Sequence, residues 1–240
     1  MKRTAVMLAL ILVLALNCPA LLLAQTGATA TPDHVHLTWT GDPATTMTIN
    51  WRTDATTRSG VVQYAKGTTI SPTSPRVAAT SRPFSTDLGT VTIHVAKLTK
   101  LSPNTQYSYR VGNGSGDWSP TCTFTTAETN PSKVKFLVFG DSQSPPGGDA
   151  PYGVWKTTLH NAFKANPDAR FFMNRGDLVD VGNNYAHWNG WFSAAAGVAD
   201  RIPIMPVVGN HETTPAAPTR RPHYWVAQFA LPQNGPDGLK

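Results

Sequence analysis

The chain has 240 residues, which is long enough for one large domain or for two ordinary ones that each bury a core. It carries 20 Lys and Arg against 14 Asp and Glu, a formal net charge of +6. This mild positive bias fits an anionic substrate but is too weak to indicate nucleic-acid binding, and the sequence holds no long basic run. We therefore expect no nucleic-acid partner.

Residues 1–24 have the order of a secretory signal. Lys2 and Arg3 precede an apolar run over residues 5–16, and a second apolar stretch ends at Ala24. The run is short for a membrane span and polar residues interrupt it, so we favour cleavage after Ala24 over a retained membrane anchor. The pattern predicts a secreted or periplasmic protein. Removal of the signal leaves Cys122 as the only cysteine, which excludes an intrachain disulfide.

Residues 31–127 show the alternation of short antiparallel strands. Apolar and polar residues alternate over 34–39, 47–51, 61–64, 91–95, 107–111 and 121–124, with turn residues between these stretches. Such spacing predicts a β-sandwich whose sheets each have one face in water. Residues 101–111 resemble the tyrosine-corner segment of fibronectin type III domains, with Trp51 placed like their core tryptophan. We expect His34, His36 and His94 at the surface or at sheet edges.

A polar linker at 128–133 separates this region from a different pattern. Residues 134–139 form a nearly continuous apolar run, which is typical of a strand covered on both faces. Two further strands are predicted over 170–174 and 204–208, and two helices over about 152–165 and 185–196. Strand, helix, strand, helix, strand predicts a parallel α/β sheet with right-handed crossovers.

Each of the three apolar strands ends in a glycine followed by a side chain that can bind metal. The endings are Gly140-Asp141, Gly176-Asp177 and Gly209-Asn210-His211. Because the carboxyl ends of parallel strands open into one crevice, these side chains should converge. One Gly-Asp pair after a strand is more often a turn or a helix cap than a ligand. Three successive endings, with two carboxylates that would repel each other without a cation, favour a metal site.

This series resembles the calcineurin-like metallophosphoesterase family, and the preceding sandwich is similar to the amino-terminal domain of purple acid phosphatases. The resemblance implies that Asp141 binds a first metal, Asp177 bridges two metals and Asn210 binds the second. His211 would stabilise the phosphoryl group or protonate the leaving oxygen. Two Fe, Mn or Zn ions would provide a metal-bound hydroxide that hydrolyses a small phosphate monoester, with diesters as a second option.

The sequence departs from the family pattern in two positions near these ligands. Asp180 stands where purple acid phosphatases have a metal-binding tyrosine, so no purple colour is expected. Gln143 stands where other relatives have histidine. Either Gln143 or Asp180 could occupy the free coordination position, and Asp180 could instead orient a neighbouring ligand.

The histidine-containing segments of the family's second half do not occur in the sequence. His223 lacks their neighbouring residues and is interpreted as a loop or packing histidine. We therefore interpret residues 134–240 as the amino-terminal half of a truncated metallophosphoesterase domain, inactive alone and complete only in a longer parent protein. The alternative is a non-catalytic exported protein, for adhesion or carbohydrate binding, with a degenerate phosphatase-like domain. The sequence leaves oligomeric state open.

Overall fold

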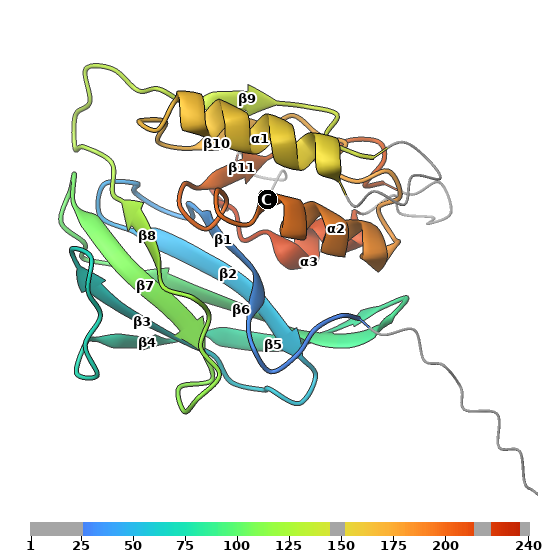
Figure 1. Cartoon of the computed structure of the whole chain (residues 1–240), viewed down its shortest axis with the longest axis horizontal. Helices are drawn as coiled ribbons and strands as arrows, with labels where there is room; N and C mark the ends of the chain where they lie inside the picture. The colour runs from blue at the N-terminus through green and yellow to red at the C-terminus, as the bar shows by residue number, and fades with distance from the viewer. Residues whose placement is uncertain (1–25, 145–151, 214–221, 236–240) are drawn as a thin grey trace, which may run out of the picture.

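A computed structural model describes residues 26–144, 152–213 and 222–235 (Figure 1). The predicted secretory signal at 1–24 lies outside these residues. Within the described ranges, no helix is long and apolar enough to cross a membrane. The chain folds as a β-sandwich of eight strands and a smaller α/β layer that lies against it (Figure 1).

The sandwich consists of two four-stranded antiparallel sheets, with strand orders β1-β2-β6-β5 and β4-β3-β7-β8. The strands are β1 (Asp33–Thr38), β2 (Met47–Asp54), β3 (Val61–Lys66), β4 (Arg76–Ala78), β5 (Thr80–Thr86), β6 (Gly89–Leu98), β7 (Gln106–Gly112) and β8 (Cys122–Thr125). The six predicted strands are therefore confirmed. Strands β4 and β5 were not predicted, because RVA is too short to show a period and TSRPFST has no regular alternation of apolar residues.

The inner core of the sandwich has the two features that the sequence predicted. Trp51 is 1% exposed and packs flat against the ring of His94, with ring centroids 5.1 Å apart. The hydroxyl of Tyr107 accepts a hydrogen bond of 2.8 Å from the backbone N–H of Ser102, which closes the tyrosine corner. His94 lies on β6 inside the sheet and is fully buried, so its predicted surface or edge position is wrong.

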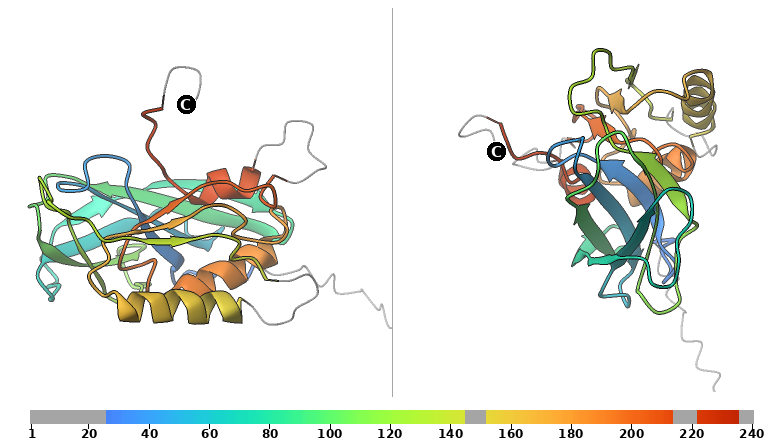
Figure 2. Two further views of the ribbon diagram at one scale, coloured as in Figure 1. Left: turned by 90° about the horizontal axis from the view of Figure 1, so that it is seen from above. Right: turned by 90° about the vertical axis from the view of Figure 1, so that its left-hand side faces the viewer.

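The α/β layer contains a three-stranded parallel sheet of order β11-β10-β9. Its elements are β9 (Leu137–Phe139), α1 (Gly153–Ala165), β10 (Phe172–Asn174), α2 (Tyr185–Ala195) and β11 (Ile204–Pro206), followed by α3 (His223–Gln228). This alternation confirms the predicted parallel sheet. Helices α1 and α2 lie together on one side of it, and α3 lies on the other side in the view from above (Figure 2).

Strand β9 is less covered than its apolar sequence suggested. It is an edge strand, and Phe139 packs edge-on against Trp155 of α1 at 5.2 Å between ring centroids. Val134, Phe136 and Val138 are each about half exposed, at 47%, 45% and 53%. The predicted cover on both faces is therefore wrong for the part of the chain that the structure describes.

The outward face of β1 and β2 is covered, contrary to the prediction of a face in water. Arg52 is 2% exposed and its guanidinium donates to both carboxylate oxygens of Asp33 and to Asn189 of α2. Asn50 accepts a hydrogen bond from the backbone N–H of Ala230. Alternating polar residues suit a wet face and a hydrogen-bonded interface equally well, so the pattern could not distinguish them. This polar face fixes the α/β layer to the sandwich.

His36 lies in this interface and is 2% exposed beneath Phe192 and Phe229. Its Nδ1 contacts the carbonyl of His34 at 2.8 Å, whereas its buried Nε2 has no hydrogen-bond partner among the described residues. Burial lowers the pKa of His36 to about 4. Strand β1 is an edge strand as expected, but His36 is not at the surface.

Acid should therefore weaken the fold through His36. The unfolded chain takes up a proton on this histidine near pH 6.5, whereas the folded chain holds it neutral down to about pH 4, so stability falls as the pH drops between these values. We expect a lower urea midpoint at pH 5.0 than at pH 7.5. His36→Phe should reduce the difference, and equal midpoints for the wild type would contradict this interpretation. His94, whose pKa burial also lowers to about 4, should account for part of the remaining loss.

Candidate metal centre

The loops that follow β9 and β10 run side by side at the carboxyl end of the sheet. The backbone N–H of Asp141 donates to the carbonyl of Gly176 at 3.2 Å, and the N–H of Gln143 donates to the carbonyl of Asp177 at 3.2 Å. Asp141 and Asp177 both adopt a left-handed backbone, with φ of 53° and 52°. Such a conformation is unfavourable for a residue with a Cβ and is found preferentially at functional sites. The first two predicted ligands therefore lie on adjoining loops.

The loop after β11 packs closely against the loop after β10, and a glycine on each loop allows this close approach. A Cβ on Gly209 would lie 2.1 Å from Oδ1 and 2.3 Å from the backbone N of Asp177. Gly176, at φ 106°, also leaves little room, because a Cβ there would lie 2.8 Å from the Cα of Gly209. These contacts bring the third strand end against the second, and the backbone N–H of His211 donates to Oδ1 of Asp177 at 3.0 Å. The structure thus joins all three predicted strand ends.

His211 is oriented by Asp180. Its Nδ1 donates to the backbone carbonyl of Asp180 at 2.7 Å and lies 3.4 Å from a carboxylate oxygen of the same residue. The bond to the Asp180 backbone raises the pKa of His211, and the nearby carboxylates of Asp177, Asp180 and Glu212 act in the same direction. With Nδ1 held in this way, Nε2 is the nitrogen available to a ligand. Both of these contacts of Asp180 are to Nδ1 of His211, and they fit a residue that orients this imidazole.

Glu212 is the site residue to which the sequence analysis assigned no role. It is 2% exposed, and its carboxylate accepts four backbone hydrogen bonds. The donors are Asp177, Leu178, Val179 and Gly209. Burial raises the pKa of Glu212, while the four donors favour its ionised form. Its sequence context, after Gly209, Asn210 and His211, carried no signal of this burial.

Ser142 and Asn174 form a buried polar layer beneath the loops. The hydroxyl of Ser142 accepts hydrogen bonds from the side-chain amide of Asn174 at 2.7 Å and from the indole of Trp191 at 3.0 Å. It lies 3.4 Å from the carbonyl of Leu178, to which it donates. Asn174 is fully buried and Ser142 is 8% exposed. This layer ties the loop after β9 to β10 and to α2.

The donor atoms at the three strand ends are oxygens. Asp141 and Asn210 are exposed, Asp177 is partly buried, and the side-chain oxygen of Gln143 is buried without a hydrogen-bond partner in the described part of the chain. A buried oxygen without a partner in the described residues, on the same loop as Asp141, is a suitable donor for a cation, and carboxylate and amide oxygens suit Mn and related ions. Among the described residues, no group of three or more His, Cys, Asp or Glu side chains could hold a metal ion. The side chains that the three loops offer to a cation are the carboxylates of Asp141 and Asp177 and the amides of Gln143 and Asn210.

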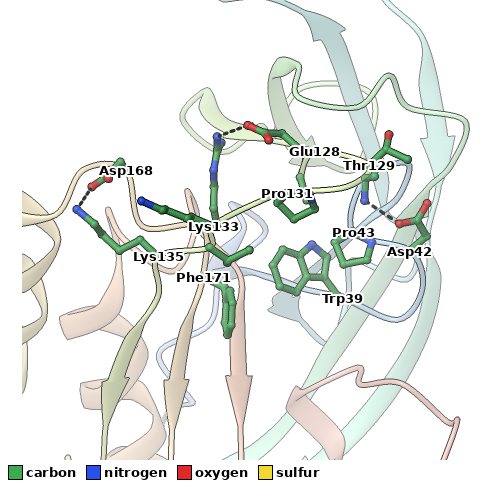
Figure 3. A pocket seen from close by; sticks show the side chains of 14 residues that line it. Trp39, Asp42, Pro43, Glu128, Thr129, Pro131, Lys133, Lys135, Asp168 and Phe171 are labelled. Atoms are coloured by element: carbon green, nitrogen blue, oxygen red, sulfur yellow. Dashed lines mark hydrogen bonds and ion pairs between the residues drawn. The ribbon is translucent and has the colours of Figure 1, made fainter.

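A cavity of about 580 Å³ lies at the other end of the sheet (Figure 3). Trp39, Pro131 and Phe171 line it, between the sandwich and the segment that connects the two layers. Four of its charged residues form ion pairs: Lys135 lies 2.8 Å from Asp168, and Arg170 lies 3.9 Å from Glu128. A second cavity, of about 540 Å³, adjoins Asp141 and Gln143. Of the predicted ligands, Asp141 and Gln143 therefore line the second cavity, and none lines the first.

An antiparallel β-sandwich followed by a parallel β/α segment of this kind is a partial metallophosphoesterase fold. The chain belongs to the purple acid phosphatase family of calcineurin-like phosphoesterases. Residues 32–126 match the family model "Purple acid Phosphatase, N-terminal domain", and residues 134–237 match "Calcineurin-like phosphoesterase".

The curated relatives include both acid phosphatases and proteins described as probably inactive. The chain is 32% identical over 195 residues to mouse acid phosphatase type 7, covering 76% of this chain and 40% of that protein. It is 28% identical over 130 residues to the probable inactive purple acid phosphatase 24 of Arabidopsis thaliana, covering 50% of this chain and 21% of the relative. The chain therefore spans about two fifths or less of the length of these relatives.

The fold resembles that of a purple acid phosphatase, PPD1, isolated from yellow lupin seeds. The two structures have a TM-score of 0.68 at 18% sequence identity, over 86% of this chain and 42% of the lupin chain. The similarity supports the arrangement of the sandwich and the α/β layer. Calcineurin-like phosphoesterases typically bind a dinuclear metal centre.

Proposed function

We propose that the complete protein carrying this chain is an exported metallophosphoesterase that hydrolyses phosphate esters, with monoesters as the preferred class. The observation that supports this most strongly is the convergence of Asp141, Asp177 and the Asn210-His211 pair at one end of the parallel sheet. Asp141 and Asp177 also share an unfavourable left-handed backbone, a feature found preferentially at functional sites. The family match and the similarity to acid phosphatase type 7 agree with this proposal.

Asp141, Asp177 and Asn210 would hold the metal ions, with Asp177 shared between the two and Gln143 as a further oxygen donor. When bound, Fe, Mn or Zn ions would neutralise the phosphate charge and activate a water molecule. His211 would bind a phosphate oxygen or give a proton to the leaving oxygen through Nε2. Asp180 would keep the imidazole in the tautomer that carries a proton on Nδ1 and would stabilise its charged form.

Replacing the histidine should separate catalysis from metal binding. We expect His211→Ala to lower kcat for p-nitrophenyl phosphate by about a hundredfold in the complete protein, since a general acid contributes at least that much. Metal content should stay unchanged, because the proposed ligands are retained. His223→Ala, at an exposed position on α3, is the control and should keep full activity. If His211→Ala lost its metal together with its activity, His211 would be a metal ligand instead.

The alternative is a non-catalytic protein, and the probable inactive plant relatives keep it open as a second candidate. Purified complete protein that retains no Fe, Mn or Zn and releases no phosphate with any of them would support that alternative.

Export is part of the proposal as well. A secreted form whose first residue is Gln25 would support it, whereas a mature protein that retains Met1 would oppose it.

A further inference from the structure

Glu212 is a buried carboxylate that bonds to the backbone of both loops nearest to His211, those after β10 and β11. Oε1 accepts the backbone N–H groups of Leu178 and Val179 at 2.8 and 3.1 Å. Oε2 accepts those of Asp177 and Gly209 at 3.0 and 2.7 Å. One carboxylate therefore satisfies four backbone donors from the ends of two different strands.

This arrangement acts directly on the backbone of Asp177. The N–H of Asp177 is bound to Oε2 of Glu212, and the next two N–H groups are bound to Oε1, so the chain is held on both sides of the left-handed residue. An unfavourable backbone conformation persists only where the surroundings fix it. The carboxylate of Asp177 points toward the third loop, because its Oδ1 accepts the N–H of His211.

We propose that Glu212 is a positioning residue of the metal centre, which fixes the backbone of Asp177 and the adjoining Gly209 so that Asp177 presents its carboxylate to the ions. The inference rests on the proposed function, since it assigns the preorganisation of that site to one buried side chain. Glu212 itself would not touch the ions, as both of its oxygens are occupied by backbone donors. Loss of an outer-shell partner typically lowers metal affinity by about 10- to 100-fold.

Glu212→Gln tests the role without changing the size of the side chain. A glutamine has one acceptor oxygen, so in either orientation its NH2 group faces two backbone N–H donors. We expect faster hydrogen exchange at the amides of Asp177, Leu178, Val179 and Gly209 in the metal-free protein, with core amides unchanged. Mn²⁺ affinity, measured by titration of the complete protein, should fall by about 10- to 100-fold.

Glu128→Gln is the matched control, because Glu128 is half exposed at the opposite end of the sheet. It should leave both the exchange of these four amides and the Mn²⁺ affinity unchanged. If Glu212→Gln does not fold, Glu212→Asp keeps both oxygens on a shorter side chain and should show the same local loosening and weaker Mn²⁺ binding.

Unchanged Mn²⁺ affinity in a folded Glu212 variant would overturn the positioning role. Faster exchange throughout the core, with unchanged affinity of the folded fraction, would overturn it in favour of a general structural role. A wild-type protein that binds no metal would instead refute the proposed function and with it the positioning of a ligand, while the exchange rates would still decide whether Glu212 joins the loops.

Discussion

Asp177→Asn should abolish phosphate release by the complete protein and lower its Mn²⁺ affinity by more than about 100-fold. Loss of an outer-shell partner already costs about 10- to 100-fold, and loss of a shared ligand should exceed that. Asparagine keeps an oxygen that can accept the N–H of His211, so the loop contact is retained while the charge is removed. Isothermal titration and a phosphate-release assay measure the two effects.

The stability of the metal-free protein separates this effect from misfolding. Asp177→Asn should change the urea midpoint little, because the asparagine oxygen keeps the loop contact to the N–H of His211. Asp168→Asn is the matched control, since Asp168 pairs with Lys135 on the exposed surface at the other end of the sheet. Full activity in the Asp177 variant, or equal loss in the Asp168 variant, would contradict the assignment.

Gly209→Ala should destabilise the protein by about 3 kcal/mol and weaken metal binding with it. The added Cβ would lie 2.3 Å from the backbone N of Asp177, and no rotation of a flexible side chain can relieve that contact. Overpacking of this kind typically costs about 1–3 kcal/mol, and a backbone obstacle places the change at the upper end. Equilibrium unfolding in urea measures the loss.

Gly116→Ala is the control for the glycine substitution. A Cβ on Gly116 would meet nothing within 4 Å, so this variant should be as stable as the wild type. An unchanged free energy of unfolding for Gly209→Ala would mean that the loops after β10 and β11 are further apart than the structure places them. A loss of stability with full metal affinity would show that the close approach of Gly209 to Asp177 supports the fold but not metal binding.

The strands with regular apolar alternation and the two long helices could be predicted from sequence, because their signals are local. The meeting of the three loops that carry Asp141, Asp177 and Asn210 could be predicted too, since parallel strands share one carboxyl end. The six-residue helix α3 and strand β4 were missed, as such short segments carry too few residues for a period to be visible.

The other errors concern contacts between segments distant in sequence. The polar face of β2 was taken for a wet surface, although Arg52 and Asn50 bond to residues more than 130 positions away. The four bonds of Glu212 likewise join it to residues 33 to 35 positions away as well as to Gly209. No local pattern distinguishes a solvated carboxylate from one buried among backbone donors.

The central claim is that the carboxyl ends of β9, β10 and β11 form one metal centre. Anomalous diffraction from crystals of the complete protein soaked with Mn²⁺ tests it most directly. We expect an anomalous peak coordinated by the carboxylates of Asp141 and Asp177 and by the amide oxygen of Asn210, and no such peak in Asp177→Asn. A well-occupied manganese ion held elsewhere, with these three side chains free of metal, would contradict the account.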